Sequence, residues 1–179
     1  MVRVFVALEL APQVRDALAG SQQTLRSCGA RLSFVKPDSI HITVKFLGEV
    51  DEKKLPAVKD ALKGITCTPF HLRATSITAD NLSRPRTVWS AIEDGGRSAA
   101  LFNKVEDALE PLGFPRETRK FTPHATIARV KRPDPSLLPA IGTLKAFSAG
   151  ESLISGFTLK KSTLTPQGPI YEDLLEVSW

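Results

Sequence analysis

Residues 40–47 read Ile-His-Ile-Thr-Val-Lys-Phe-Leu, and residues 123–130 read Pro-His-Ala-Thr-Ile-Ala-Arg-Val. Both stretches are rich in apolar and β-branched residues, which is typical of strands. Each contains His-x-Thr, although the whole chain has only three histidines. Side chains alternate along a strand, so the His and Thr of each copy share one face, and their apolar neighbours line the other. The two copies therefore predict two strands that each present an imidazole and a hydroxyl over a hydrophobic core.

Short strands and about three helices are expected around these two stretches. Strands are expected over residues 2–8, 30–35, 40–47, 67–78, 86–93, 123–130, 151–161 and 170–177. Helices are expected over 12–27, 52–63 and 97–112, and residues 133–139 are expected to be a loop or a short helix. The elements show no sustained strand–helix–strand alternation, which favours the α+β class. No linker is long enough to split the chain, so residues 1–179 are expected to form a single domain.

The composition favours a globular protein with anionic partners. The chain has 179 residues, of which 42% are hydrophobic, and 24 Lys and Arg against 19 Asp and Glu give a net charge of +5. This balance favours nucleic acid, nucleotides or phosphate esters as partners. Cys28 and Cys67 are far from any C-x-x-C spacing, which excludes a disulfide framework. No stretch approaches the ~20 apolar residues of a membrane span, so a cytoplasmic location without a membrane partner is expected.

Two imidazoles that face each other across a cleft suit phosphodiester chemistry without a metal. A neutral imidazole takes a proton from the attacking water or hydroxyl, and a protonated one gives a proton to the leaving oxygen. Two threonine hydroxyls nearby can donate hydrogen bonds to the non-bridging phosphate oxygens. The spacing does not match H-E-x-x-H or carboxylate-rich metal sites, which makes a metal centre the weaker interpretation.

These motifs and several shorter stretches resemble those of a known family. The stretches are residues 3–10, 39–48, 88–89, 112–114, 121–130 and 168–171, in order along nearly the whole chain. The sequence resembles the two-histidine phosphoesterases, and most closely their RNA 2′,3′-cyclic phosphodiesterase branch, also called 2′-5′ RNA ligase-like. The segments around the two His-x-Thr motifs are the specific ones, and the others are supportive.

The resemblance implies a bilobal α+β fold, with two mostly antiparallel sheets and flanking helices around a central cleft that carries both His-x-Thr strands. It implies that a terminal RNA 2′,3′-cyclic phosphate is hydrolysed to a 2′-phosphate, with His41 as proton donor and His124 as proton acceptor. Thr43, Thr126 and Arg129 would hold the phosphate. No metal and no cofactor are expected. The expected partners are RNA ends or nucleotides with a 2′,3′-cyclic phosphate, and the protein is expected to be a monomer.

The position of Arg129 raises a geometric question. Ideal strand alternation places Arg129 on the face opposite His124, because the two are five residues apart. A bulge or the end of the strand must therefore reorient Arg129 if it is to reach the phosphate. The alternative is a solvated charge at the end of the strand.

Other features keep two interpretations each. The basic segment 116–132, with Lys36 and Lys45 in addition, is either an RNA-backbone contact or a solvated basic loop. Aromatic side chains either stack on a terminal base or pack in the core, with core packing expected for most of them. The residues in question are Phe46, Trp89, Phe121 and Tyr171. His71 lacks the motif and is interpreted as an ordinary strand histidine.

Two other functions remain open beside hydrolysis. The same residues could join RNA ends by 2′-5′ ligation, since a catalyst serves both directions of a reaction. A non-catalytic module that binds RNA ends would keep the cleft and lose turnover. The presence of both histidines favours an enzyme.

Overall fold

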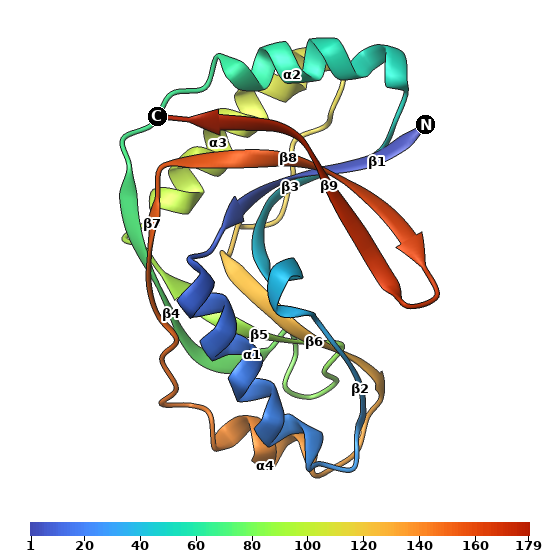
Figure 1. The fold of residues 1–179 in the computed structure, drawn as a ribbon, viewed down its shortest axis with the longest axis vertical. Coiled ribbons are helices and arrows are strands. Elements are labelled where there is room, and N and C mark those ends of the chain that lie inside the picture. Colours follow the sequence, from blue (N-terminus) through green and yellow to red (C-terminus); the bar gives the residue numbers. More distant parts are fainter.

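The structure, a computed structural model, describes residues 1–179 as an α+β fold (Figure 1). The strands are β1 (Val2–Glu9), β2 (Arg31–Phe34), β3 (His41–Val50), β4 (Phe70–Ala79), β5 (Thr87–Glu93), β6 (His124–Arg132), β7 (Gly150–Ile154), β8 (Gly156–Thr165) and β9 (Gly168–Ser178). The helices are α1 (Pro12–Arg26), α2 (Leu55–Lys63), α3 (Arg97–Leu109) and α4 (Leu137–Gly142), with 3₁₀ turns at Pro37–Ser39, Glu52–Lys54 and Glu110–Leu112. No helix combines the length and the apolar character that crossing a membrane would require.

The nine strands form one antiparallel sheet that is divided into two lobes. The strand order is β7-β4-β5-β6-β3-β1-β8-β9, and β2 pairs with β6. β3 and β6 pair only through Ile42 and Ala125, so the sheet narrows to a single pair of residues between the lobes. Helices α2 and α3 lie against the lobe of β1, β3, β8 and β9, and α1 and α4 lie against the other (Figure 1). The α+β class is confirmed. The two expected sheets are the two halves of one continuous sheet, joined at the pair of Ile42 and Ala125.

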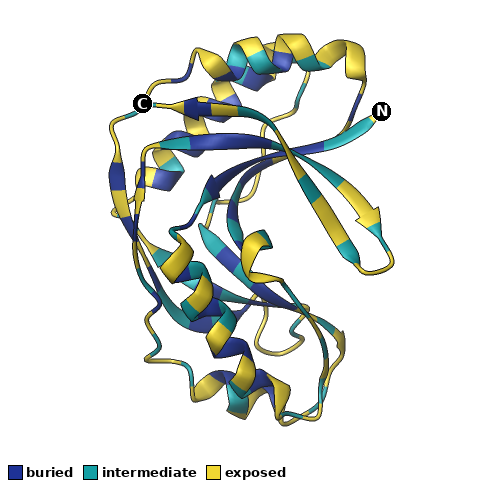
Figure 2. Cartoon of the chain, viewed as in Figure 1, coloured by how far each residue is buried: buried dark blue, intermediate teal, exposed yellow.

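The pattern of apolar residues explains why β1 and α1 form where they do. β1 lies between β3 and β8, and its residues Val4 to Leu8 are all buried, as the dark centre of the sheet in Figure 2 shows. An unbroken apolar run suits a strand that is covered on both faces. Helix α1 starts with Pro12, whose fixed φ suits the first turn, and buries Val14, Leu18 and Leu25 on one face. One continuous core results from this burial.

The prediction of one continuous strand over residues 151–161 is wrong, because two separate strands, β7 and β8, meet at Ser155. β7 pairs with β4 in one lobe, whereas β8 pairs with β1 in the other, so the segment leaves one half of the sheet and joins the other. Gly156 lies at this crossing, and a Cβ there would collide with the carbonyl oxygen of Val177. The alternation of apolar and polar residues along the segment does not show which strand pairs with it, so the sequence could not reveal this change of partner.

A β-bulge interrupts β6 directly after its His-x-Thr motif. Val88 of β5 pairs with Ala128, and Trp89 pairs with Thr126, so Ile127 is an extra residue without a partner on β5. Gln22, buried on α1, donates hydrogen bonds from Nε2 to the carbonyl oxygens of Ile127 (3.0 Å) and Val35 (2.7 Å). A bulge interrupts the ladder; here the carbonyl oxygen of Ile127 accepts from the backbone NH of Val35 (2.9 Å) and from Gln22 on the helix.

We expect Gln22→Leu to lower the free energy of unfolding by about 1–3 kcal/mol, because buried carbonyl oxygens lose a donor. Urea denaturation measures this change. Gln23→Leu is the matched control, since Gln23 is the exposed neighbour on the same helix. Equal stability of the two variants would show that the Gln22 side chain does not support the bulge.

Candidate active site

The two His-x-Thr motifs meet at the narrow point between the lobes. Ile42 and Ala125 are fully buried partners, so antiparallel pairing places His41 opposite Thr126 and Thr43 opposite His124. All four side chains lie on the face away from the core and line one cavity of about 60 Å³. The other residues that line it are Val35, Ser39, Phe46, Arg129 and Tyr171. The structure therefore brings together all five site residues expected from the sequence.

Hydrogen bonds fix both imidazole rings in the same way. Nδ1 of His41 lies 2.8 Å from the carbonyl oxygen of Ser39, and Nδ1 of His124 lies 2.8 Å from that of Thr122. A carbonyl oxygen only accepts, so Nδ1 carries the hydrogen in each ring. Nε2 is then the basic nitrogen of each neutral imidazole, and Nε2 of His41 lies 3.1 Å from Oγ1 of Thr43. Both rings are preset to exchange protons through Nε2.

Burial lowers the pKa of both histidines below the ordinary value of 6.5. Burial disfavours the charged imidazolium and outweighs the hydrogen bonds to Ser39 and Thr122, which act in the opposite direction. The carboxylate of Glu9, which pairs with His41 across β1 and β3, also raises the pKa of His41. Among the causes of these shifts, a carboxylate acts only on His41.

Matching bulges reorient the fifth residue after each histidine. On β6 the bulge at Ile127 turns Arg129 back onto the face of His124, where it pairs with Thr87 and lines the cavity. On β3, Val6 pairs with Lys45 and Ala7 with Thr43, so an extra residue there turns Phe46 toward the same cavity. Of the two possibilities that the sequence left for Arg129, a bulge or the end of the strand, the structure shows a bulge.

The surroundings of the two histidines differ. The ring of His41 packs in a cluster with Phe5, with centroids 5.0 Å apart, and Tyr171, whose ring meets it edge-on at 5.4 Å. The ring of His124 lies on Trp89, with centroids 3.9 Å apart. These rings restrict the movement of both imidazoles. Phe46 is 61% exposed, so a core-packing role is wrong for this residue.

Lys45 does not belong to a basic surface, and this expectation is wrong. Its side chain is 7% exposed and lies 2.5 Å from the carboxylate of Glu106 on α3, which is 1% exposed. Nζ also donates to the carbonyl oxygen of Pro115 (2.9 Å), and the second oxygen of Glu106 accepts from the backbone NH of Glu117 (3.1 Å). The bulge on β3 turns Lys45 toward the core. Nothing in the local sequence pattern marks Lys45 and Glu106 as a buried pair.

The hydrogen bonds of Lys45 and Glu106 hold Pro115 and Glu117 next to β3. These two residues belong to one wall of a larger groove. Residues 114–122 line a groove of about 650 Å³ that continues from the cavity and also includes Thr43, His124, Thr126 and Arg129. Phe121 on this wall stacks on Phe102 of α3, with ring centroids 4.7 Å apart. The groove is large enough for a nucleotide next to the two histidines.

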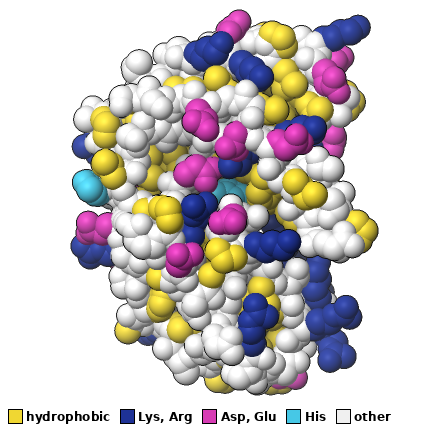
Figure 3. All heavy atoms as spheres, viewed as in Figure 1, with side chains coloured by type: hydrophobic (Ala, Val, Ile, Leu, Met, Phe, Trp, Pro, Cys, Tyr) yellow, Lys and Arg dark blue, Asp and Glu magenta, His cyan; other side chains and the backbone are white.

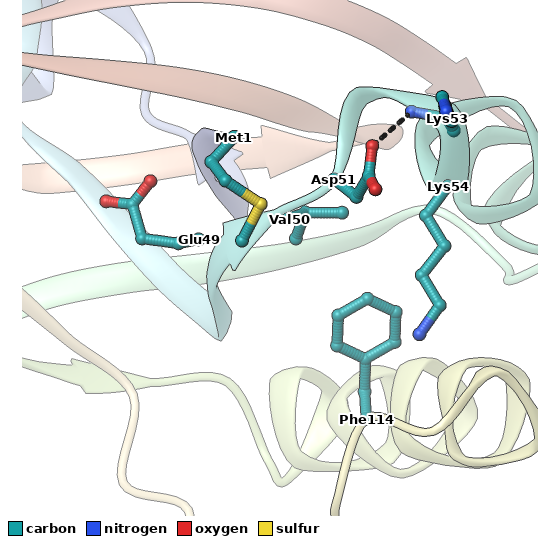
Figure 4. A pocket seen from close by; sticks show the side chains of 7 residues that line it. All are labelled: Met1, Glu49, Val50, Asp51, Lys53, Lys54 and Phe114. Carbon is teal, nitrogen blue, oxygen red and sulfur yellow. Dashed lines mark hydrogen bonds between the residues drawn. The ribbon is translucent and has the colours of Figure 1, made fainter.

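The other hollows lack these reactive groups. His71 is exposed on β4 beside Arg73 and Glu93, so it lies outside the cleft, as expected. The hollow of about 450 Å³ in Figure 4 lies between the N-terminus, the end of β3 and Phe114, and it holds Lys54 over the Phe114 ring. Neither contains a histidine paired with a hydroxyl. No three His, Cys, Asp or Glu side chains converge to form a metal site.

We expect the Cε1 proton resonances of His41 and His124 to titrate with midpoints below pH 6.5, since burial lowers the pKa of both. Sulfate in the cleft should move both midpoints upward, because an anion stabilises the imidazolium. Proton NMR titration measures this, with His→Gln variants for assignment. A midpoint above pH 6.5 for either ring without an anion would contradict the prediction.

Comparison with known proteins places the chain in a family. The sequence profile of the LigT like Phosphoesterase family matches residues 8–89 and 93–171. Proteins named RNA 2′,3′-cyclic phosphodiesterase are similar over nearly the full length. The relative from Archaeoglobus fulgidus is 36% identical, with 97% of this chain and 98% of the relative covered. The relative from Methanothermobacter thermautotrophicus is 35% identical, with coverage of 97% and 96%.

Solved structures show the same fold. The structure of TT0787 of Thermus thermophilus has a TM-score of 0.84 and 30% identity, and the match covers 98% of this chain and 97% of that one. E. coli LigT complexed with 3′-AMP has a TM-score of 0.82 at 22% identity, with coverage of 99% and 97%. With two His-x-Thr strands facing one cavity and a family profile that spans most of its length, this chain belongs to the LigT like phosphoesterases.

Proposed function

We propose that this protein is an RNA 2′,3′-cyclic phosphodiesterase that hydrolyses the cyclic phosphate to a 2′-phosphate. The observation that carries the proposal is the shared cavity, in which two imidazoles, two threonine hydroxyls and Arg129 converge. The names of the full-length relatives at 35–36% identity support the same activity. These groups are suited to proton transfer and to binding a phosphate, which are the two requirements of the reaction.

In the proposed reaction, water attacks phosphorus on the side opposite the 3′-oxygen. Nε2 of His124 takes a proton from the water as the new P–O bond forms. Nε2–H of His41 gives its proton to the 3′-oxygen as the P–O3′ bond breaks, leaving a 3′-hydroxyl and a 2′-phosphate. Proton exchange with solvent then restores a neutral His124 and a protonated His41.

The assignment of acid and base rests on the resemblance, and charges of both signs act on His41. Glu9 lies opposite His41 in the ladder and opposes the lowering of its pKa by burial. No carboxylate is among the causes that shift the pKa of His124. Lys160 and Arg129 act against Glu9 and lower the pKa of His41, so the roles of His41 as donor and His124 as acceptor follow the resemblance. The anionic phosphate, once bound, stabilises the imidazolium further.

Thr43, Thr126 and Arg129 are proposed to bind the non-bridging phosphate oxygens. Negative charge grows on these oxygens in the transition state, and preorganised donors stabilise it. The guanidinium of Arg129 adds a full positive charge and planar donor geometry. Trp89 holds the ring of His124 in place from one side. Ser39 contributes through its backbone, because its carbonyl orients His41.

The other expectations from the sequence stay predictions. A single domain, a monomeric state, a cytoplasmic location and a reaction without a metal or cofactor belong to this group. The comparisons favour neither 2′-5′ ligation nor a non-catalytic module. EDTA in the assays described here tests the metal-free mechanism directly.

We expect His41→Ala and His124→Ala each to lower kcat by about 10³-fold, within the range of positioned acid–base groups. Phosphorus NMR follows an oligoribonucleotide that ends in a 2′,3′-cyclic phosphate, in EDTA. His71→Ala is the control and should keep the wild-type rate, and circular dichroism checks the fold of all three. Near-wild-type turnover in both site variants would refute the mechanism, and a 3′-phosphate product would reverse the leaving oxygen.

Removal of either threonine hydroxyl should slow the chemical step. Thr43→Val and Thr126→Val keep the β-branched shape and are expected to lower kcat by about 10²-fold, as the loss of one transition-state donor does. Thr→Ser at each position restores the hydroxyl and should recover most of the rate. Single-turnover kinetics measures the step. Valine variants within twofold of wild type would exclude the hydroxyls as donors.

A further inference from the structure

A row of cations continues outward from the active site along two paired strands. Arg129 pairs with Ser33 of β2, and the single irregularity of the β2–β6 ladder places Arg132 opposite Arg31. Residues that pair directly in an antiparallel ladder share a face, and Arg31 shares a face with Ser33 because the two are two residues apart. Arg129, Arg31 and Arg132 therefore lie on one face. The two residues of β2 from Ser33 to Arg31 carry the row about 7 Å beyond Arg129.

The cations of this row are unpaired in the protein. Arg31, Arg129 and Arg132 are all exposed, and none of them takes part in an ion pair. Asp134 lies near Arg132 in the sequence, but its Oδ1 accepts hydrogen bonds from the backbone (2.9 Å) and the side chain (2.5 Å) of Ser136. By contrast, Arg116 on the groove wall is paired with Asp107 and Glu110. The positive charge of the row is therefore available to a ligand.

The pairing of Arg31 with Arg132 is unfavourable for the protein alone. Like charges directly opposite each other in an antiparallel ladder are destabilising. No carboxylate forms an ion pair with either arginine, although Asp134 interacts with Arg132 at longer range. Figure 3 shows Lys and Arg side chains gathered along the edge of the lower lobe, in the region of β2 and β6 in Figure 1. A polyanion that lies along this edge would relieve the repulsion.

We infer that the basic row, defined as Arg31 and Arg132 beyond Arg129, binds the phosphate backbone of the RNA upstream of the cyclic phosphate. This inference rests on the proposed function. The terminal nucleotide lies at the two histidines, Arg129 touches both the cavity and the start of the row, and the preceding nucleotides run along β2 and β6. Backbone contacts of this kind carry no sequence information. The protein therefore prefers oligoribonucleotide ends of any sequence over cyclic mononucleotides.

The test compares 2′,3′-cyclic AMP with a ten-nucleotide RNA that ends in adenosine 2′,3′-cyclic phosphate. We expect kcat/KM of the wild type to be at least about 10-fold higher for the RNA at low salt, because phosphate contacts raise affinity there. Arg31→Gln/Arg132→Gln should lose most of this advantage and keep the rate on cyclic AMP within twofold. Its salt dependence for the RNA should flatten by about 0.7 in log–log slope for each lost phosphate contact.

Lys53→Gln/Arg97→Gln is the matched control, since it removes the same charge from exposed positions on the other lobe and at the start of α3. It should retain the preference for RNA. Equal kcat/KM for both substrates in the wild type, or equal losses in both double variants, would overturn the basic row and leave the proposed function intact. A loss on cyclic AMP equal to that on RNA would place the two arginines in the cleft instead. Absence of turnover on both substrates would refute the proposed function itself.

Discussion

Ile42 of β3 and Ala125 of β6 form the only pair through which the sheet ladder connects the two lobes, and the site is built around this pair. Both side chains are fully buried, so the register cannot slip by one residue without exposing them and burying two histidines. The same register sets each imidazole opposite the hydroxyl of the other motif. One apolar contact therefore determines the geometry of the polar groups on the opposite face.

The bulges that follow each motif give the two halves of the site different chemistry. Both halves have a β-bulge after the motif, but the bulge on β6 places Arg129 beside His124, whereas the bulge on β3 places Phe46 beside His41. One side of the cavity is thus cationic and the other is aromatic. This difference suits a substrate with an anionic phosphate and a flat base. Gln22 supports the cationic side from α1 through the carbonyl oxygen of Ile127.

The buried pair of Lys45 and Glu106 links this arrangement to the groove wall. Replacing a buried ion pair with apolar residues often costs little stability, whereas removing one partner alone is costly. In this protein the pair also satisfies the carbonyl of Pro115 and the NH of Glu117. It therefore holds the segment that leads to Thr122, whose carbonyl orients His124. The first motif strand and the approach to the second are joined through one buried network.

Sequence alone determined the α+β class and most of the strands and helices, because these depend on local periodicity. The repeated His-x-Thr pointed to His41, Thr43, His124 and Thr126, and the family resemblance added Arg129. It also determined that a bulge or the end of the strand must reorient Arg129, since strand alternation is a local rule. Tertiary structure alone decided where that bulge lies, that Lys45 is buried against Glu106, and that the strand over 151–161 breaks at Ser155. The pairing of Arg31 with Arg132 belongs to the same group. These features depend on which strand or helix lies opposite a residue, and contacts between distant segments leave no periodic trace in the chain.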